Sequence, residues 1–181
     1  MSEEKDENVE AQDIPVNIIA QYVRDLSFEN PNASEVLRGG RDLPEMDLNI
    51  GMDARKIEDK NDDALYEVVL NIRAEAKQGN EAMFIGELQY GATVSIGDEI
   101  PEESHHPFLL IEIPRLIFPF ARQIMSDVTI SGGYPPLMLN PIDFHALYMQ
   151  RFGEEIEAAR QELREELQET AKKDTSGKKK K

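Results

Sequence analysis

The stretch Tyr66-Glu-Val-Val-Leu-Asn-Ile-Arg-Ala-Glu-Ala-Lys77 has the clearest pattern in the chain and decides its fold class. Every second side chain in it is apolar, and the residues between them are polar except for Val69. Successive side chains of a β-strand point to opposite faces of the sheet. The alternation therefore predicts a strand with one buried and one solvated face.

Three further segments have strand character. A run from Ile14 to Phe28 is broken by Asn30-Pro31-Asn32, and a short run covers residues 46–50. The fourth segment, residues 84–90, follows Gln78-Gly79-Asn80, which is suited to the turn of a hairpin. Four strands with one solvated face predict an antiparallel sheet.

The same alternation assigns side chains of the first and fourth segments to the two faces of this sheet. We expect the apolar face to carry Tyr22, Arg24, Leu26, Phe28, Phe84, Gly86, Leu88 and Tyr90. The solvated face is then expected to carry Asp25, Ser27, Glu29, Ile85, Glu87 and Gln89.

The second half of the chain has helical periodicity. Residues 114–131 are predicted to form a helix that Gly132-Gly133 ends. Phe118 and Met125 widen its apolar stripe to one side, so we expect this helix to contact more than its own sheet. The stripe itself consists of Ile117, Phe120, Ala121, Ile124 and Val128.

A second helix is predicted to start at Asn140-Pro141-Ile142-Asp143, with Asn140 as its N-cap and Pro141 as its first helical residue. We expect a charged helical segment over residues 154–171 to continue it, followed by a lysine-rich tail without regular structure. The apolar face of the second helix consists of Phe144, Leu147, Tyr148 and Phe152.

The charge of the chain is strongly negative and unevenly placed. The net charge is −16, but residues 172–181 carry +5, so residues 1–171 carry −21. Such a field repels nucleic acid and anionic membranes and favours a partner with a basic face. Residues 1–13 are acidic with little to bury, so we expect them to be disordered, and they lack the features of a signal peptide. No apolar run approaches the roughly 18–20 residues that span a bilayer, which predicts a cytoplasmic protein.

The sequence offers little support for an enzyme. It contains no cysteine and no GxxxxGK[ST] loop, and Gly132-Gly133 is better explained as a helix stop than as a phosphate-binding loop. His105-His106 is the nearest approach to a metal cluster, but adjacent histidines on an extended chain point to opposite sides, so we expect a polar loop. The carboxylates lie mainly on the predicted solvated faces of the strands, where their usual role is to keep the protein soluble. We therefore expect no catalytic residue, no cofactor and no metal.

Several separate blocks of sequence carry a resemblance that covers roughly residues 14–152. One is the segment from Pro114-Arg-Leu-Ile-Phe-Pro-Phe-Ala-Arg to Tyr134-Pro-Pro-Leu-Met-Leu-Asn-Pro-Ile-Asp-Phe-His-Ala-Leu-Tyr-Met. The others are residues 24–33, Arg-Asp-Leu-Ser-Phe-Glu-Asn-Pro-Asn-Ala, and the strands Tyr66-Glu-Val-Val-Leu and Phe84-Ile-Gly-Glu-Leu-Gln-Tyr-Gly. In register, these blocks resemble the SecB family of bacterial protein-export chaperones: the first is similar to its C-terminal half, the second to its first-strand signature, and the last two to its third and fourth strands.

This resemblance implies an α+β fold, a four-stranded antiparallel sheet packed with two main helices, assembled as a homotetrameric dimer of dimers. It implies a holdase that works without ATP, binds unfolded precursor proteins in the cytosol, keeps them translocation-competent and delivers them to the SecA motor. The chaperone domain would be residues 14–152, between the acidic N-terminus of residues 1–13 and the charged extension of residues 153–181. Residues 98–113 depart from the family pattern, and their conformation is left open. By position, the contacts to SecA would be Asp25, Glu29, Ile85 and Glu87; Asp47, Glu67 and Glu75 would broaden them into an acidic plate.

The surface that binds unfolded clients must be apolar yet tolerant of sequence. The candidates are Leu37, Leu43, Phe144 and Tyr148, although an aromatic residue at helical spacing is more often part of a core. Two other classes of protein stay open at this point: an acidic adaptor that joins two folded proteins, and a carboxylate- or metal-dependent hydrolase. Suppression of aggregation of an unrelated denatured protein, without nucleotide, distinguishes a holdase from both.

Overall fold

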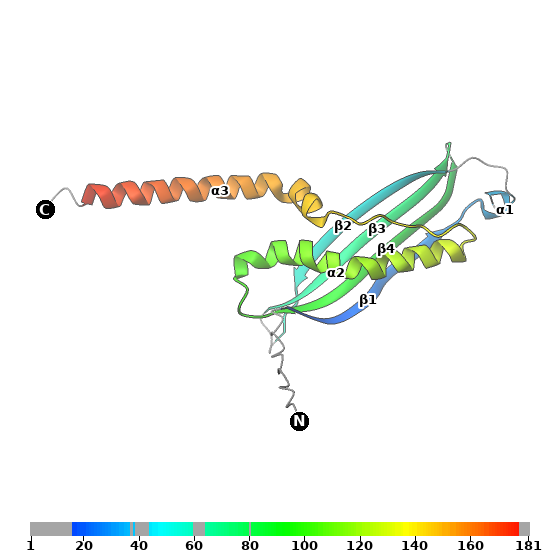
Figure 1. The fold of residues 1–181 in the computed structure, drawn as a ribbon, viewed down its shortest axis with the longest axis horizontal. Coiled ribbons are helices and arrows are strands. Elements are labelled where there is room, and N and C mark those ends of the chain that lie inside the picture. The colour runs from blue at the N-terminus through cyan, green and yellow to red at the C-terminus, as the bar shows by residue number, and fades with distance from the viewer. Residues whose placement is uncertain (1–15, 37, 39–43, 60–63, 80, 178–181) are drawn as a thin grey trace, which may run out of the picture. The chain divides into compact units, whose positions relative to one another are not determined.

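A computed structural model describes residues 16–36, 38, 44–59, 64–79 and 81–177 of the chain (Figure 1). It divides into two compact units, residues 1–140 and residues 141–181. The elements of the first unit are β1 (Val16–Glu29), α1 (Ala33–Val36), β2 (Glu45–Lys56), β3 (Leu65–Gln78), β4 (Glu81–Ile96) and α2 (Glu102–Ser131). The second unit contains α3 (Phe144–Gly177). Within the described residues, no helix is both long and apolar enough to cross a lipid bilayer.

The four strands form one antiparallel sheet in the order β1-β4-β3-β2, and α2 lies across one of its faces (Figure 1). This confirms the predicted α+β class. We call the face toward α2, which carries Leu70 and Ile72 of β3, the inner face. The opposite face, which carries Asn71 and Arg73, is the outer face. The core lies between the inner face and the helix, where Ile113, Ile117, Ala121 and Met125 of α2 are fully buried.

The alternation in β3 and β4 is as predicted, but β1 departs from it. A β-bulge between Val23 and Asp25 inserts one residue into β1, which resets the alternation of its side chains. Leu26 pairs with Leu88 on the inner face, whereas Tyr22 pairs with Gly91 on the outer face. The prediction that Tyr22 and Arg24 share the apolar face with Leu26 and Phe28 was therefore wrong.

Strand β2 is longer than its predicted range of residues 46–50. It pairs with β3 in unbroken register from Glu45 to Lys56. Gly51 and Ala54 carry little apolar signal, so the alternation fades in the sequence while the backbone ladder continues. The predicted turn between β3 and β4 is confirmed, because the strands end at Gln78 and resume at Glu81 with Gly79 at φ +59°.

Helix α2 begins at Glu102, twelve residues before the predicted start at residue 114. Pro107 and Pro114 lie inside it and obscure its pattern in the sequence, since proline removes a helical hydrogen bond. Buried Leu109 and Leu110 hold this first half against the sheet. The predicted stripe was also centred wrongly, because Phe118 is buried while Phe120 is 52% exposed.

Helix α3 also differs from its prediction at both ends. Asp143, not Asn140, caps it: Asp143 Oδ1 accepts a hydrogen bond from the Ala146 N–H at 2.9 Å. Asn140 and Pro141 lie in the irregular segment that precedes the helix. The helix continues without a break through Gly153 to Gly177, so part of the lysine-rich segment is helical.

The end of α2 is packed closely against β1. Gly133 has φ +86° and ends the helix as predicted, while Gly132 has an ordinary φ of −75°. A Cβ atom at Gly132 would lie 2.3 Å from Cε1 of Phe28, whose ring stacks on Phe84 with a centroid separation of 5.6 Å. Glycine is needed at position 132 for this close approach.

Gly132→Ala is expected to destabilise the protein by roughly 1–3 kcal/mol, because the methyl group must displace Phe28 from its aromatic neighbours. The midpoint of urea unfolding measures the change. Gly153→Ala is the matched control: the nearest atom to its Cβ is Cε of Met149 at 3.8 Å, and alanine favours a helix interior. A midpoint for Gly132→Ala equal to or above that of the unmodified protein would contradict this packing.

Candidate docking face and apolar pocket

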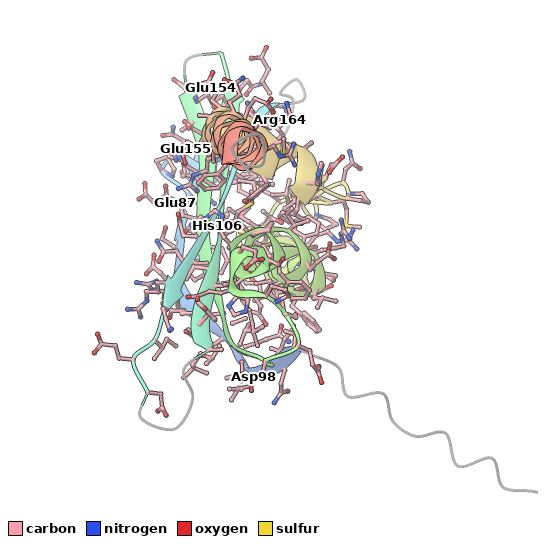
Figure 2. All side chains as sticks on the ribbon, turned by 90° about the vertical axis from the view of Figure 1, so that its left-hand side faces the viewer. Glu87, Asp98, His106, Glu154, Glu155 and Arg164 are labelled. Carbon is pink, nitrogen blue, oxygen red and sulfur yellow. The ribbon has the colours of Figure 1, made fainter. Side chains whose placement is uncertain are left out.

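The residues that are predicted to dock lie on the outer face, in three neighbouring rows that run across the strands. Asp25 and Glu29, four residues apart on β1, are separated by about 13 Å along the strand. Both are exposed, as is Glu87, while Ile85 is half-buried. The pairing places Asp25, Gln89, Asn71 and Gly51 in the first row, Ser27, Glu87, Arg73 and Asn49 in the second, and Glu29, Ile85, Glu75 and Asp47 in the third. Figure 2 shows Glu87 on the side of the sheet away from α2. The four residues thus share one face, and their role in docking stays a prediction.

Two cations of β3 pair with the acids of these rows: Arg73 in the second row, and Lys77, which lies just beyond the third. Arg73 pairs through Nη2 with Oε2 of Glu75 at 2.9 Å and through Nη1 with Oε1 of Glu87 at 3.2 Å. Lys77 Nζ lies 3.2 Å from Oε1 of Glu75. Glu75 is therefore held between two cations, and its side chain is only 16% exposed. A hollow of about 210 Å³ beside Arg73 is lined by Asp25, Asn49, Asn71, Ile72, Arg73, Glu87, Leu88 and Gln89.

Glu67 does not contribute to an acidic plate as expected, because it is 6% exposed and bound by its neighbours. Its carboxylate accepts hydrogen bonds from the Tyr22 hydroxyl and from Nε of Arg55, and Nη1 of Arg24 lies 3.4 Å away. The Arg55 guanidinium holds the pKa of Glu67 below its ordinary value, and Tyr22 adds to this effect, while partial burial opposes it. We call Glu67 with Tyr22, Arg24 and Arg55 the Glu67 cluster.

The Glu67 cluster joins β1, β2 and β3 on the outer face and crosses β4. Arg55 belongs to β2, Glu67 to β3, and Tyr22 and Arg24 to β1. The intervening strand β4 contributes Gly91, where a Cβ atom would lie only 2.7 Å from Cε2 of the Tyr22 ring. Glycine therefore allows the tyrosine ring to cross β4 and reach Glu67. Burial of the Tyr22 hydroxyl raises its pKa, and the neighbouring carboxylate adds to this effect.

An apolar pocket of about 380 Å³ opens where the segment after α2 passes the hairpin of β3 and β4. It is lined by Pro44, Met46, Met83, Phe84, Tyr134, Pro135, Pro136, Leu137 and Met138. Its aromatic side is fixed: the rings of Phe84 and Tyr134 lie 4.8 Å apart, and the Tyr134 hydroxyl lies 2.8 Å from Oδ1 of Asn30. Its methionine side is open, since Met46 is 44% and Met138 is 69% exposed.

The client-binding role of Leu37, Leu43, Phe144 and Tyr148 stays a prediction. Phe144 and Tyr148 are buried, with 1% and 6% exposure. Leu37 and Leu43 lie outside the described residues, although Leu43 directly precedes Pro44 in the sequence. The sequence interpretation missed the methionines, whose flexible thioether side chains adapt to differently shaped apolar partners. The signal was available in Tyr134-Pro-Pro-Leu-Met138, an extended apolar segment directly after a helix stop.

His105 has a structural contact rather than a place in a polar loop. It lies in the first turns of α2, where Nδ1 is 2.9 Å from the Tyr66 hydroxyl and Nε2 is 2.9 Å from the carbonyl oxygen of Ile100. In the neutral ring, Nε2–H donates to that carbonyl and Nδ1 accepts from Tyr66. His105 therefore attaches the start of α2 to β3. The described ranges contain no group of three or more histidine or carboxylate side chains that could hold a metal ion.

Comparisons with known proteins show what this chain is similar to. The family model described as preprotein translocase subunit SecB matches residues 9–155. The protein-export protein SecB of Bartonella quintana is 48% identical over 138 residues, which cover 76% of this chain and 84% of that protein. SecB of Maricaulis maris is 44% identical over 153 residues, covering 84% and 86%. In fold, the chain is similar to a Mycobacterium tuberculosis SecB-like chaperone solved with an antitoxin peptide, with a TM-score of 0.57, 13% identity, and coverage of 71% of this chain and 91% of that one.

Glu67→Gln is expected to lower the free energy of unfolding at pH 7 by roughly 1.5–3 kcal/mol, because hydrogen bonds to a charged acceptor are lost. The folded-state pKa of Glu67 is depressed, so its contribution to stability is fully present above the unfolded pKa of about 4.3 and is lost as the pH falls from there through the lower folded-state pKa. The difference between the two proteins in urea titrations should therefore shrink between pH 7 and pH 3. Asp47→Asn, at an exposed position of the same face, is the control and should cost no more than about 0.5 kcal/mol. A difference that is constant with pH would exclude the ionised Glu67 as the source of the stability.

Proposed function

Because the chain belongs to the SecB family of protein-export chaperones, we propose that it is a cytoplasmic holdase that binds unfolded precursor proteins without ATP and delivers them to the SecA motor. Its work is binding rather than catalysis. The observation that carries the proposal is that the two faces of one sheet differ in chemistry. The outer face is acidic, and an apolar, methionine-lined pocket lies next to the inner face.

A holdase acts through the free energy of client binding alone. One client-binding event at a hundredfold excess over the dissociation constant favours the unfolded client by about 2.7 kcal/mol. Folded domains are typically stable by about 5–15 kcal/mol. The chaperone therefore captures precursors before they fold, and does not unfold finished proteins.

We assign client capture to the pocket between Met46 and Met138. An unfolded chain presents apolar side chains in no fixed order, so its receptor needs a firm base and an adaptable rim. Phe84 and Tyr134 form the base, because their rings are packed together and Tyr134 is anchored to Asn30. An adaptor that joins two folded proteins has no use for such a pocket, which favours the holdase over this alternative.

We assign SecA docking to Asp25, Glu29, Ile85 and Glu87 on the outer face. Glu29 pairs with the half-buried Ile85 across the strands, Glu87 lies two residues from it on β4, and Asp25 extends the exposed acidic surface two rows further along β1. A basic partner thus finds charge complementarity beside a small apolar contact. The Glu67 cluster lies on the same face, but its carboxylate is already neutralised by Arg55 and is not available to a partner.

The dimer of dimers is supported by apolar surface that one chain leaves open. On α2, Leu116, Phe120 and Ile130 are between 52% and 54% exposed. Strand β1 is at an edge of the sheet, where backbone groups are suited to pairing with another chain. Exposed apolar residues of this number on one helix are typical of a protein interface. We therefore assign the α2 surface to contacts between copies.

Light scattering at micromolar concentration should return about four times the 20.6 kDa mass of one chain. Phe120→Glu should reduce this mass, because a charge replaces an apolar contact between copies. Met138→Glu is the control, since it changes an exposed apolar side chain outside α2 and should leave the mass unchanged. A monomer mass for the unmodified protein would refute the assembly.

Asp25→Lys/Glu87→Lys should abolish most SecA binding at low salt and leave capture of denatured clients intact. Two attractive charges become repulsive, and surface substitutions of this kind usually change stability by no more than about 0.5 kcal/mol. The effect should shrink toward about 1 M salt, where the Debye length is about 3 Å. Titration of labelled protein against SecA at two salt concentrations measures docking, and suppression of aggregation without nucleotide measures capture.

The matched control is Asp98→Lys/Glu99→Lys, which makes the same change in net charge in the exposed loop between β4 and α2. Figure 2 shows Asp98 far from Glu87, at the end of the sheet. Equal SecA affinities for the two double variants would remove the outer face from the docking mechanism. Failure of the unmodified protein to suppress aggregation would remove the holdase function itself.

A further inference from the structure

Arg73 lies at the centre of the outer face and binds the same carboxylate that the proposed docking requires. Its guanidinium contacts Glu75 at 2.9 Å and Glu87 at 3.2 Å, from the row of the sheet that also contains Ser27 and Asn49. The Arg73 side chain is 40% exposed, and that of Glu87 is 51% exposed. The pair is thus open to solvent, where a partner can reach it.

The two contacts of Arg73 differ in strength. The contact to Glu75 is shorter and its carboxylate is largely covered, while the contact to Glu87 is longer and both groups are exposed. Ion pairs between exposed groups contribute little to stability and are screened by salt. The bond to Glu87 can therefore be exchanged while the bond to Glu75 keeps Arg73 in place.

A basic residue of a partner competes with Arg73 for Glu87. A carboxylate binds arginine best through two parallel hydrogen bonds, one to each oxygen, and Arg73 already occupies Oε1. The positive charge of Arg73 also cancels part of the local field that attracts a basic partner. Both effects weaken docking without touching the partner's own residues.

We propose that Arg73 is a built-in competitor of the docking partner, which an arginine or lysine of that partner displaces from Glu87. This inference rests on the proposed docking role of the outer face and deepens it by naming the exchange that docking requires. Arg73 keeps the affinity of the outer face for its partner low enough for the partner to be released. When the partner leaves Glu87, Arg73 takes its place.

Lys77 provides a matched control within the same strand. Its side chain is 41% exposed, close to the value for Arg73, and it also pairs with Glu75. This ion pair does not involve Glu87. Arg73→Gln and Lys77→Gln remove the same charge from two positions four residues apart on one face, so a difference between them isolates the competition at Glu87 from the general field.

The test uses the full chain and two probes, SecA and a hexa-arginine peptide. The methyl NMR signal of Ile85, two residues from Glu87 on the same face and assigned with Ile85→Val, reports binding at this site. At low salt, Arg73→Gln should bind both probes about three- to tenfold more tightly than the unmodified protein. Lys77→Gln should change either affinity by less than about twofold, and the gain should disappear when Arg73→Gln is combined with Glu87→Gln.

Equal gains for Arg73→Gln and Lys77→Gln would overturn the proposal, because the general field would then explain both. A gain that persists in the Glu87→Gln background, or an unchanged affinity of Arg73→Gln, would overturn it as well. The failure of the proposed function has a different signature. If hexa-arginine distinguishes the variants while SecA binds none of them, Arg73 is a competitor on this face, but the physiological partner is another basic protein.

Discussion

In the two central strands, β3 and β4, successive side chains point alternately toward α2 and toward solvent. This two-residue period constrains every other surface of the molecule. On the inner face, Leu70, Ile72 and Leu88 are buried beneath α2 and form the core. On the outer face, the same strands present Arg73 and Glu87 to solvent. A shift of one residue in the register would exchange the two sets, burying charge and exposing the core. The stability of the fold and the proposed docking therefore depend on one pattern.

The acidic residues of the outer face have two different roles. Glu67 is withdrawn from solvent and joins the strands through Arg55 and Tyr22, so its charge serves the sheet. Glu87 remains exposed and shares Arg73 with Glu75, so its carboxylate is open to the proposed basic partner. The difference lies in the neighbours: Tyr22 reaches Glu67 because Gly91 leaves room for its ring. Net charge alone does not distinguish these roles.

The sequence predicts the parts of this structure that repeat and misses the parts that depend on single contacts. The alternation over residues 66–77 and 84–90 is sufficient for the sheet and for the placement of Ile85 and Glu87. The alternation of apolar and polar residues does not reveal the β-bulge beside Val23, because one inserted residue changes the face of Tyr22 without changing the composition of the strand. Prolines hid the start of α2 in the sequence, because the burial of this part of the helix outweighs their helix-breaking effect. The methionine-lined pocket was missed because Met46 and Met138 are far apart in the sequence.

The central claim is that clients and SecA use opposite sides of one sheet and therefore bind at the same time. It is tested most directly by sedimentation of the protein bound to a fluorescent unfolded client, with saturating SecA added and no nucleotide present. The account predicts that the client signal moves into a larger complex containing all three components. Release of the client in proportion to SecA bound would contradict it, because the two partners would then compete for one surface.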